Sequence, residues 1–463
     1  MKPHDPLLAG WEETLARKRE RPAIFNTRGE CMRSFQQIEE QAHVWERKID
    51  MFPAGSVIAV QIGNHEDWPV ILLACLRRRL VVLPLDESLS EQQRHGAFKT
   101  CGVVAAAVSG GRDIEILPAA TPAATPQWSG DPPALLKLTS GTTAAPRAIR
   151  FGSEQLLADC NQICETMGIG DVDLNFGVIP VSHSYGFSNL LTPLIGRGVP
   201  LVLSRDRTPR ALIVDLARTG ATVFPGTPVF YHSLVEIEDL PALPKLGLCI
   251  SAGAPLPIAT ARKFREKFNR PIHSFYGASE CGGICYDREG ANEAEGFVGQ
   301  PMDNVAVDLI EPQAASTQVR IRSAAAGDGY FPEPEEEKLG SGCFVPDDLL
   351  QKTPAGFRLV GRVSDLINVA GRKVNPAEVE ACLLRFGGVR EAVVFGREST
   401  RRNQEVAACV VASADVREQE LLEFCRKRLN TWQAPRRIFL VDGIPVNERG
   451  KVSRRELAQR FVG

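Results

Sequence analysis

The chain of 463 residues has no run of about 18 apolar residues, which is the length that a membrane-spanning helix needs. Its first residues have no apolar core of the kind that a secretory signal peptide carries. Charges nearly balance, with 54 Lys and Arg against 56 Asp and Glu, and neither a basic stripe interleaved with aromatic residues nor a base-reading motif is present. These absences argue against membrane, secreted and nucleic-acid-binding proteins, and they predict a cytoplasmic location.

Metal-binding cysteine patterns are also missing. The twelve cysteines are scattered along the chain, and the tightest spacings, Cys160/Cys164 and Cys281/Cys285, have no partner ligands that would complete a zinc site. We therefore expect reduced thiols, most of them buried.

The chain does contain alternating strand and helix patterns. Hydrophobic residues make up 44% of it, enough for sizeable cores. Extended apolar runs at 56–61, 81–85 and 147–151 are followed by helical patterns at 65–76, 90–98 and 153–166. This alternation predicts an α/β fold with parallel-rich sheets covered by helices.

Local signals predict where some of these elements begin and end. Ser153 is expected to cap a helix, Gly220 to end one and Pro228 to open another. The proline-rich stretch 117–126 has no amphipathic period, so we expect a linker there.

The pattern changes after about residue 362. A helix is expected at 375–386 with Asn375 as its cap, a second helix at 419–429, and strands near 389–396, 405–411 and 437–441, which together make a small α+β unit. Residues 361–463 carry 19 Lys and Arg against 13 Asp and Glu, a net charge of +6. This surplus fits either an acidic partner or solvated helix faces.

The most informative feature is the run Leu138-Thr139-Ser140-Gly141-Thr142-Thr143-Ala144-Ala145-Pro146-Arg147. Hydroxyls and backbone N–H groups at a glycine bend are suited to wrapping a polyphosphate, and the run ends in a cation. A similar run is often only a surface turn. It is therefore a candidate nucleotide-binding loop that needs support from elsewhere in the chain.

That support comes from four later features in a fixed order: Tyr276-Gly277-Ala278-Ser279-Glu280, Phe344-Val345-Pro346-Asp347-Asp348-Leu349, Gly361-Arg362-Val363-Ser364-Asp365 running into Gly371-Arg372-Lys373, and Lys451. With the first run, this series closely resembles the adenylate-forming superfamily of acyl-CoA synthetases, luciferases and peptide-synthetase adenylation domains. The resemblance covers about residues 20 to 460. It implies a large domain at 1–361 and a mobile lid at 362–463, with a hinge near Ser364.

The resemblance implies that a carboxylate attacks the α-phosphate of ATP, giving acyl adenylate and pyrophosphate, and that the thiol of CoA or of a carrier-protein phosphopantetheine then takes the acyl group. The phosphates would be held by Thr139, Ser140, Gly141, Thr142, Thr143 and Arg147. The family has glycine where Ala144 and Ala148 stand and lysine where Arg147 stands. We expect these departures to affect turnover more than ATP binding.

Other residues acquire nucleotide roles from the same resemblance. Tyr276, followed by Gly277, offers a ring for adenine, Ser279 a hydroxyl for the α-phosphate and Glu280 a carboxylate for Mg²⁺. The ribose is assigned to Asp348 and Arg362, and the segment Ser251-Ala252-Gly253 is placed in the same site.

The resemblance also assigns a catalytic lysine and a thiol channel to the lid. Lys451 would bridge the attacking carboxylate and the α-phosphate, after which rotation of the lid would bring Gly371, Arg372 and Lys373 to a channel for the thiol.

The acyl pocket is assigned to segments that match the family, with His183 beside the acyl group; its predicted walls are His183, Ser184, Tyr185, Phe224, Gly226, Ala252, Gly253, Ala278, Gly282 and Gly283. Residues 180–190 have no aspartate to bind an α-ammonium group, which favours a fatty or aryl acid over an α-amino acid. Gly282 and Gly283 either leave room for the acyl group or serve the backbone turn.

Three functions remain open from the sequence. The first is an AMP-forming acyl-CoA synthetase, and the second is a stand-alone enzyme that loads a carrier protein. The third is a catalytically weak protein that binds nucleotide or acyl ligand, which is supported by the departures Ala144, Ala148, Arg147 and Ser364.

Overall fold

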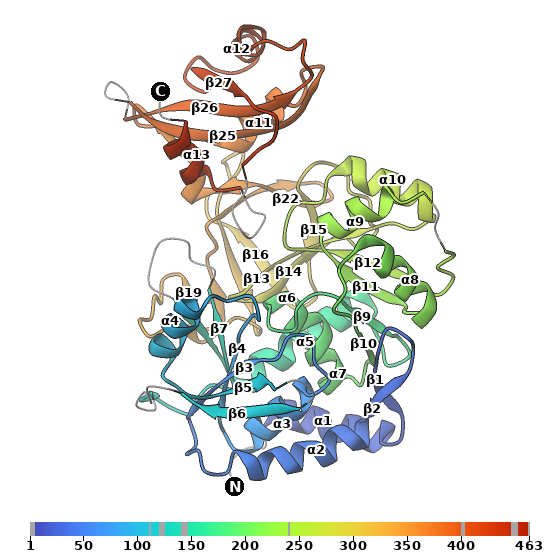
Figure 1. Cartoon of the computed structure of the whole chain (residues 1–463). Helices are drawn as coiled ribbons and strands as arrows, with labels where there is room; N and C mark the ends of the chain where they lie inside the picture. The colour runs from blue at the N-terminus through green and yellow to red at the C-terminus, as the bar shows by residue number, and fades with distance from the viewer. Residues whose placement is uncertain are drawn as a thin grey trace. The chain divides into compact units, whose positions relative to one another are not determined.

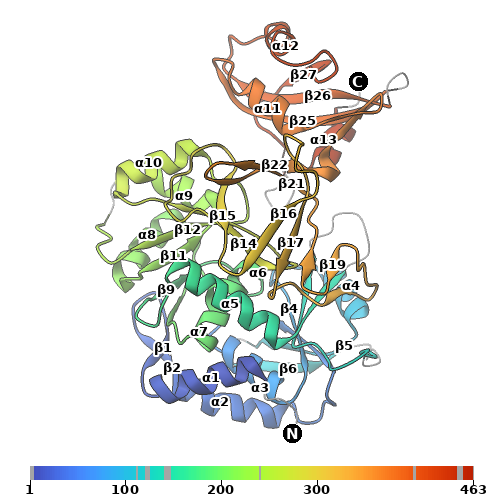
Figure 2. The ribbon, with the colours of Figure 1, turned by 180° about the vertical axis from the view of Figure 1, so that it is seen from behind.

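The computed structural model describes residues 5–110, 113–119, 126–139, 147–238, 241–399, 403–445 and 452–461. The chain divides into two compact units, which Figures 1 and 2 show from opposite sides. The first unit comprises Met1–Asp308, Arg320–Pro346 and Thr353–Arg358. The second comprises Leu309–Val319, Asp347–Lys352 and Leu359–Gly463.

One sheet of the first unit carries the start of the predicted phosphate loop. Its strand order is β18-β8-β7-β4-β3-β5-β6. The central strands β7, β4, β3 and β5 are parallel, whereas β18, β8 and β6 are antiparallel to their neighbours. The bounds are β3 (Val57–Gln61), β4 (Val81–Pro84), β5 (Val103–Ser109), β6 (Ile114–Pro118), β7 (Leu135–Leu138), β8 (Ala148–Phe151) and β18 (Gly329–Phe331).

A second sheet of the first unit carries most other predicted site segments. Its order is β2-β1-β10-β9-β11-β12-β13-β14-β15, continued by the first residues of β22 (Gly356–Arg362). In this sheet β1, β10, β9, β11, β12 and β13 are parallel to one another. Strand β14 is antiparallel to its neighbours β13 and β15. The bounds are β1 (Pro22–Phe25), β2 (Cys31–Ser34), β9 (Asn175–Gly177), β10 (Leu201–Leu203), β11 (Val223–Gly226), β12 (Leu248–Ser251), β13 (His273–Ala278), β14 (Gly282–Tyr286) and β15 (Phe297–Pro301).

A small antiparallel sheet has the order β16-β17-β20-β19. Its strands are β16 (Val305–Leu309), β17 (Val319–Ser323), β19 (Leu339–Gly340) and β20 (Cys343–Phe344).

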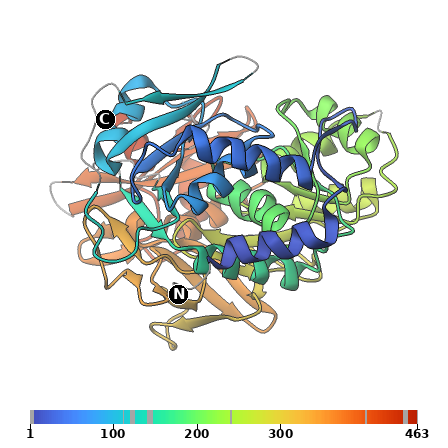
Figure 3. The same ribbon diagram turned by 90° about the horizontal axis from the view of Figure 1, so that it is seen from below.

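Helices cover these sheets, and two of them matter most for the site. Helix α5 (Ser153–Met167) packs against α1, α7 and β14, and a π-helical turn, η1 (Phe187–Leu191), follows the short helix α6 (Ser184–Gly186). Figure 3 shows the N-terminal helices α1 and α2 in blue on the face turned toward the viewer. The remaining helices of the first unit are α1 (Pro6–Lys18), α2 (Phe35–Lys48), α3 (Trp68–Arg77), α4 (Glu91–Cys101), α7 (Thr192–Gly196), α8 (Pro209–Thr219), α9 (Pro228–Val235) and α10 (Ile258–Phe268).

The second unit is a four-stranded core sheet, β24-β23-β26-β25, to which β27 adds in parallel beside β26. One set of buried residues joins α11 and α12 to the sheet, including Val379, Leu421 and Val410, and another joins Leu457 of α13 to Phe395. The bounds are β21 (Asp348–Thr353), η2 (Val363–Asp365), β23 (Ile367–Val369), β24 (Arg372–Val374), α11 (Pro376–Leu383), β25 (Val389–Ser399), β26 (Asn403–Ala412), α12 (Glu418–Arg426), β27 (Arg437–Leu440) and α13 (Arg454–Arg460).

The predicted α/β fold class, with its small C-terminal α+β part, is confirmed. Gly220 ends α8 with φ 64°, Pro228 opens α9, and Asn375 caps α11 by accepting from Ala377 N. Ten of the twelve cysteines are buried, as expected, and all twelve are free thiols.

Two local predictions are wrong. Gly152, not Ser153, is the cap of α5, because the Ser153 hydroxyl instead donates to Asp5 Oδ2 at 2.5 Å. The start of the expected linker belongs to β6, where Leu117 and Pro118 pair with β5, and residues 120–125 lie outside the described ranges.

Candidate functional site

The two ends of the predicted phosphate loop are held together by the β7–β8 hairpin. Leu138 pairs with Ala148, and Thr139 donates to Arg147 O through its backbone N at 2.8 Å and through Oγ1 at 3.3 Å. The loop residues Ser140, Gly141, Thr142 and Thr143 lie outside the described ranges. The structure therefore brings Thr139 and Arg147 together at the base of this loop.

Arg147 connects this loop to Glu280 through one aromatic side chain. Its guanidinium lies 4.0 Å from the ring centroid of Tyr330, and the Tyr330 hydroxyl donates to Glu280 Oε1 at 3.2 Å. Arg147 Nη1 also forms an ion pair with Glu335 Oε2 at 3.0 Å. Burial raises the pKa of Tyr330, and the neighbouring Glu280 charge raises it further, so this phenol stays a protonated donor.

Tyr330 and Glu335 were not predicted from the sequence. Tyr330 reaches the loop because β18 pairs with β8, where Tyr330 faces Ile149. Glu335 and Arg147 are 188 positions apart, and no motif in the sequence links the two residues. A strand pairing of this separation has no local sequence signal.

The turn between β13 and β14 joins two other predicted segments. The Ser184 hydroxyl donates to the Ser279 hydroxyl at 3.0 Å, which links a predicted acyl wall to the predicted α-phosphate ligand. Tyr276 is 8% exposed, so only a small part of its ring is available to a ligand. Gly277 is needed for the turn, since a Cβ there would lie 2.7 Å from Gly282 O.

His183 directly precedes α6, and its charge is close enough to Asp86 to affect the pKa of that carboxyl group. Burial raises the pKa of Asp86, but hydrogen bonds from Ser88 together with the charges of His183 and Arg207 outweigh burial and lower it overall. Asp86 is thus an acidic neighbour of His183 that was not predicted.

Some predicted acyl walls belong to the packed interior. Phe224 is fully buried, with its ring centroid 5.3 Å from that of Tyr231. The Tyr185 hydroxyl donates to Ile250 O at 3.3 Å, and burial raises its pKa. A side chain at Gly226 would lie 3.0 Å from the Tyr231 ring. These three positions shape the end of β11 and β12 rather than an open surface.

The end of β12 carries a hydroxyl suited to a ligand. Ser251 is 2% exposed, and its Oγ has no hydrogen-bond partner among the described residues. An unsatisfied buried hydroxyl costs free energy, which a ligand or water contact would recover. Ala252 is buried, and Gly253 has φ 87° at a place where an added Cβ would lie 4.0 Å from Thr227 Cγ2.

Gly282 and Gly283 are required by close packing. A Cβ at Gly282, where φ is 68°, would lie 2.0 Å from Asp159 Oδ1, and Gly283 N donates to the same oxygen at 3.0 Å. A Cβ at Gly283 would lie 2.4 Å from Met302 Sδ. Of the two explanations open from the sequence, the structure favours the backbone turn.

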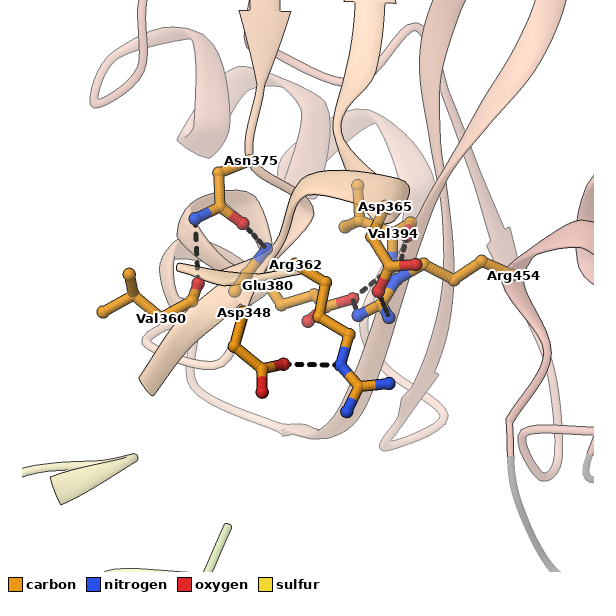
Figure 4. Close-up of polar contacts among 9 residues, drawn as sticks. Asp348, Val360, Arg362, Asp365, Asn375, Glu380, Val394 and Arg454 are labelled. Carbon is orange, nitrogen blue, oxygen red and sulfur yellow. Dashed lines mark hydrogen bonds and ion pairs between the residues drawn. The ribbon is translucent and has the colours of Figure 1, made fainter. Parts of the chain in front are cut away.

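In the second unit, the two predicted ribose ligands touch each other. Arg362 Nε donates to Asp348 Oδ1 at 2.7 Å (Figure 4), with the Asp348 side chain 10% exposed and that of Arg362 63% exposed. Gly371 has φ 86° in the turn between β23 and β24, and Arg372 and Lys373 are exposed on β24. Ser364 lies in η2, and Lys451 lies outside the described ranges.

A cluster around Arg454, also missed from the sequence, fixes the start of α13. Its guanidinium contacts Asp365 Oδ2 and Glu380 Oε1, both at 2.8 Å, and donates to Val394 O at 3.0 Å (Figure 4). Asp365 directly follows the predicted hinge residue Ser364. Arg454 therefore connects the hinge segment to the part of the chain that follows Lys451.

The described residues contain no group of three or more His, Cys, Asp and Glu side chains that would hold a metal by themselves. Mg²⁺ at a nucleotide commonly takes one or two protein carboxylates, with phosphate and water oxygens as its other ligands. The carboxylate of Glu280 fits such a shared site.

A comparison with family models decides the family. The model described as AMP-binding enzyme matches residues 11–330, and the model described as AMP-binding enzyme C-terminal domain matches residues 378–451. The chain belongs to the AMP-binding enzyme family. This places it in the adenylate-forming superfamily, as its motifs predicted.

Curated relatives of this AMP-binding enzyme include ligases with different acceptors. A probable CoA ligase of Humulus lupulus is 26% identical over 88% of this chain and 87% of its own, and an oxalate–CoA ligase of Arabidopsis thaliana is 25% identical over 88% and 89%. A 3,4-dihydroxybenzoate–[aryl-carrier protein] ligase of Bacillus anthracis is 27% identical over 71% and 74%.

Among solved structures, ATP-bound MatB from Rhodopseudomonas palustris has a TM-score of 0.85, with 20% identity and 99% of both chains covered. At this identity the similarity establishes the shared fold. No helix in the described ranges has the length and apolar character needed to cross a membrane.

Proposed function

We propose that this AMP-binding enzyme activates a carboxylic acid with ATP as acyl-AMP, releases pyrophosphate, and transfers the acyl group to the thiol of CoA. The observation that carries the proposal is the chain of contacts from Arg147 through Tyr330 to Glu280. It joins the predicted phosphate cation to the predicted Mg²⁺ ligand, two residues far apart in sequence. Phosphoryl transfer depends mainly on such positioning and charge neutralisation.

In this proposal the phosphates of ATP lie at the β7–β8 loop, with Thr139, Ser140, Gly141, Thr142, Thr143 and Arg147 as ligands. Glu280 would hold Mg²⁺, which supplies positive charge to the phosphate oxygens. Tyr330 fixes the orientation of Glu280 through its hydroxyl. The ion pair between Arg147 and Glu335 is partly exposed and therefore weak. Arg147 would leave Glu335 and bind phosphate when ATP is present.

The nucleoside is assigned to Ser251, Ala252, Gly253, Tyr276 and Gly277 in the first unit and to Asp348 and Arg362 in the second. The unpartnered Ser251 hydroxyl supports the first assignment. The hydrogen bond from Arg362 supports the second, because it holds one oxygen of the Asp348 carboxylate and so orients the group for ribose hydroxyls.

Lys451 would stabilise the transition state of adenylation, and Ser279 would bind the α-phosphate. We propose residues 1–361 and 362–463 as the two domains, with Ser364 as the hinge. Rotation there would replace Lys451 by the exposed turn at Gly371, Arg372 and Lys373, which would line the thiol channel.

The substrate we propose is a fatty or aryl acid, with its acyl group beside His183, Ser184 and Ala278. The absence of aspartate at 180–190 supports an acid without an α-amino group. The names of the curated relatives support acid activation in general. A cytoplasmic location fits the twelve free thiols.

A carrier protein is the second candidate acceptor, favoured by the aryl-carrier ligase among the relatives. The +6 charge of residues 361–463 suits CoA phosphates and an acidic carrier alike. A catalytically weak binding protein is the third possibility, and its support is still Ala144, Ala148, Arg147 and Ser364.

The test is pyrophosphate release with Mg-ATP and hydroxylamine across fatty, aryl and amino acids, repeated for the best acid with CoA or with a phosphopantetheinylated carrier. We expect a clear preference for one fatty or aryl acid and stimulation by CoA. Stimulation by the carrier alone would select the loading function. If no acid led to pyrophosphate release while ATP still bound, the result would favour the catalytically weak protein.

A further inference from the structure

A buried asparagine holds the segment that leads from β9 to His183. Asn64 lies between β3 and α3 and is 8% exposed. Its Nδ2 donates to Gly177 O at 3.0 Å and to Ile179 O at 3.2 Å, and its Oδ1 accepts from Val181 N at 2.9 Å. The amide therefore bonds to every second residue from 177 to 181.

The same side chain links the two large sheets of the first unit. Its Nδ2 also donates to Ser204 O at 3.2 Å, directly after β10. Strand β3 belongs to the sheet with the predicted phosphate loop, whereas β9 and β10 belong to the second sheet. Asn64 supplies the two donors and the acceptor that these buried backbone groups need, and without it they would be left unpaired at a cost in free energy.

The segment held by Asn64 leads directly into His183. His183 N donates to Pro180 O at 3.0 Å, and Phe187 N donates to His183 O at 2.8 Å. A Cβ at Gly186 would lie 2.1 Å from Pro180 O, so α6 packs tightly on the same turn. A shift of residues 177–181 would therefore move His183 and the start of α6 as well.

The end of β3 also holds the acidic neighbour of His183. Gln61 Nε2, three positions before Asn64, donates to Asp86 O at 2.9 Å. The backbone of Asn64 is fixed in turn, because Arg205 Nε donates to Asn64 O at 3.1 Å. Gln61 and Asn64 together hold the two segments that carry Asp86 and His183.

We propose that Asn64 is a positioning residue of the acyl site, which places His183 beside the acyl group by holding residues 177–181. This inference rests on the proposed function, which assigns His183 to the acyl pocket. It goes beyond that function, because it makes recognition of the acid depend on a residue outside the predicted pocket walls. A misplacement of about 1 Å at a site can cost about 10²-fold in rate, even when the altered residue is remote from the chemistry.

The test measures pyrophosphate release by Asn64→Ala and by the unaltered protein. The KM for the preferred acid is determined at saturating Mg-ATP, and the KM for ATP at saturating acid. We expect the KM for the acid to rise about tenfold or more and that for ATP to change by less than about threefold. The reason is that the lost hydrogen bonds hold the His183 segment, whereas the proposed phosphate ligands lie on the β7–β8 loop.

Asn292→Ala is the matched control. Asn292 is 9% exposed, and its Nδ2 donates to Ile272 O at 2.7 Å and to Gly290 O at 3.1 Å, while its Oδ1 accepts from Ser274 Oγ at 2.9 Å. Its φ of 46° adds strain to the alanine, so urea unfolding should show a loss of stability at least comparable to that of Asn64→Ala. The KM for the acid should nevertheless stay within about twofold of the unaltered value.

Hydrogen exchange followed by mass spectrometry tests the placement of the segment without any acid. In Asn64→Ala, exchange should become faster in the peptides that cover residues 177–187, because their anchoring hydrogen bonds are lost. Exchange in β11 and β12 should stay as in the unaltered protein. Asn64→Ser takes the place of the alanine variant in every measurement if Asn64→Ala does not fold.

An unchanged KM for the acid, equal rises in the two KM values, or the same rise for the acid in Asn292→Ala would overturn the proposal and make Asn64 a purely structural residue. If no acid releases pyrophosphate, the proposed function fails separately. Hydrogen exchange then decides this inference. Faster exchange confined to residues 177–187 supports it, and exchange that is unchanged, or faster throughout the first unit, overturns it.

Discussion

Glu280, the proposed Mg²⁺ ligand, accepts a hydrogen bond from the Tyr330 hydroxyl. In Glu280→Gln the amide keeps the size of the side chain but loses the charge that is proposed to bind Mg²⁺. We expect the Mg²⁺ concentration for half-maximal rate to rise at least about tenfold, with a loss in kcat of roughly 10²-fold. Pyrophosphate release titrated with Mg²⁺ at constant ATP measures both.

Glu289→Gln is the control for this change, since Glu289 lies in the same region of the chain but is exposed. It should leave the Mg²⁺ titration unchanged. If the Mg²⁺ dependence of pyrophosphate release were unchanged in Glu280→Gln, the assignment of Glu280 as a Mg²⁺ ligand would be wrong.

Gly282 and Gly168 allow two reasons for a glycine, backbone conformation and close packing, to be measured separately. Both have φ 68°, but a Cβ at Gly282 would overlap Asp159 Oδ1, whereas nothing lies within 4 Å at Gly168. Gly168→Ala should therefore cost only the left-handed backbone strain, about 1–2 kcal/mol. Gly282→Ala should cost about 2–5 kcal/mol because overpacking adds to that strain.

Urea unfolding of the two variants under identical conditions measures the difference. Equal shifts in the midpoint would contradict the close packing of Asp159 on this turn.

Helix α13 begins in a cluster that ties it to η2, α11 and β25 through Arg454. Arg454→Met should free the start of α13, which follows Lys451 in the sequence. We expect adenylation to slow by about tenfold or more, because positioning of a catalytic charge is lost. Thiol capture of a supplied acyl adenylate should change less.

Arg460→Met, at the exposed end of the same helix, serves as the control and should retain both half-reactions. Equal slowing of the two half-reactions in Arg454→Met would show that Arg454 supports the fold of the second unit rather than the position of Lys451.

Elements with strong local signals were predictable from the sequence. The pairs β3–α3, β4–α4 and β8–α5 follow from apolar periodicity, and Gly220 and Asn375 end and begin helices through their own backbone preferences. Ser153 was misplaced by one position because a partner distant in sequence, Asp5, takes its hydroxyl. Local patterns do not contain such partners.

The candidate site divides in the same way. Its motif residues were identified because they form short runs, whereas Tyr330 and Glu335 reach it through strand pairing and an ion pair between distant segments.

In the proposed function the two units of the molecule have separable roles, because Lys451, in the second unit, is proposed to act only in adenylation. Lys451→Ala should lower the adenylation rate by about 10²–10³-fold or more. Capture of a supplied acyl adenylate by CoA should be spared. Rapid-quench measurement of each half-reaction tests this, and equal loss of both would refute the assignment.

The central claim is that a carboxylate oxygen of the substrate attacks the α-phosphate of ATP. The most direct measurement uses the preferred acid labelled with ¹⁸O in its carboxylate, with Mg-ATP and CoA, followed by mass spectrometry of the nucleotide product. The account predicts AMP that carries one ¹⁸O atom, together with unlabelled pyrophosphate. Unlabelled AMP, or ADP with ¹⁸O in inorganic phosphate, would contradict it.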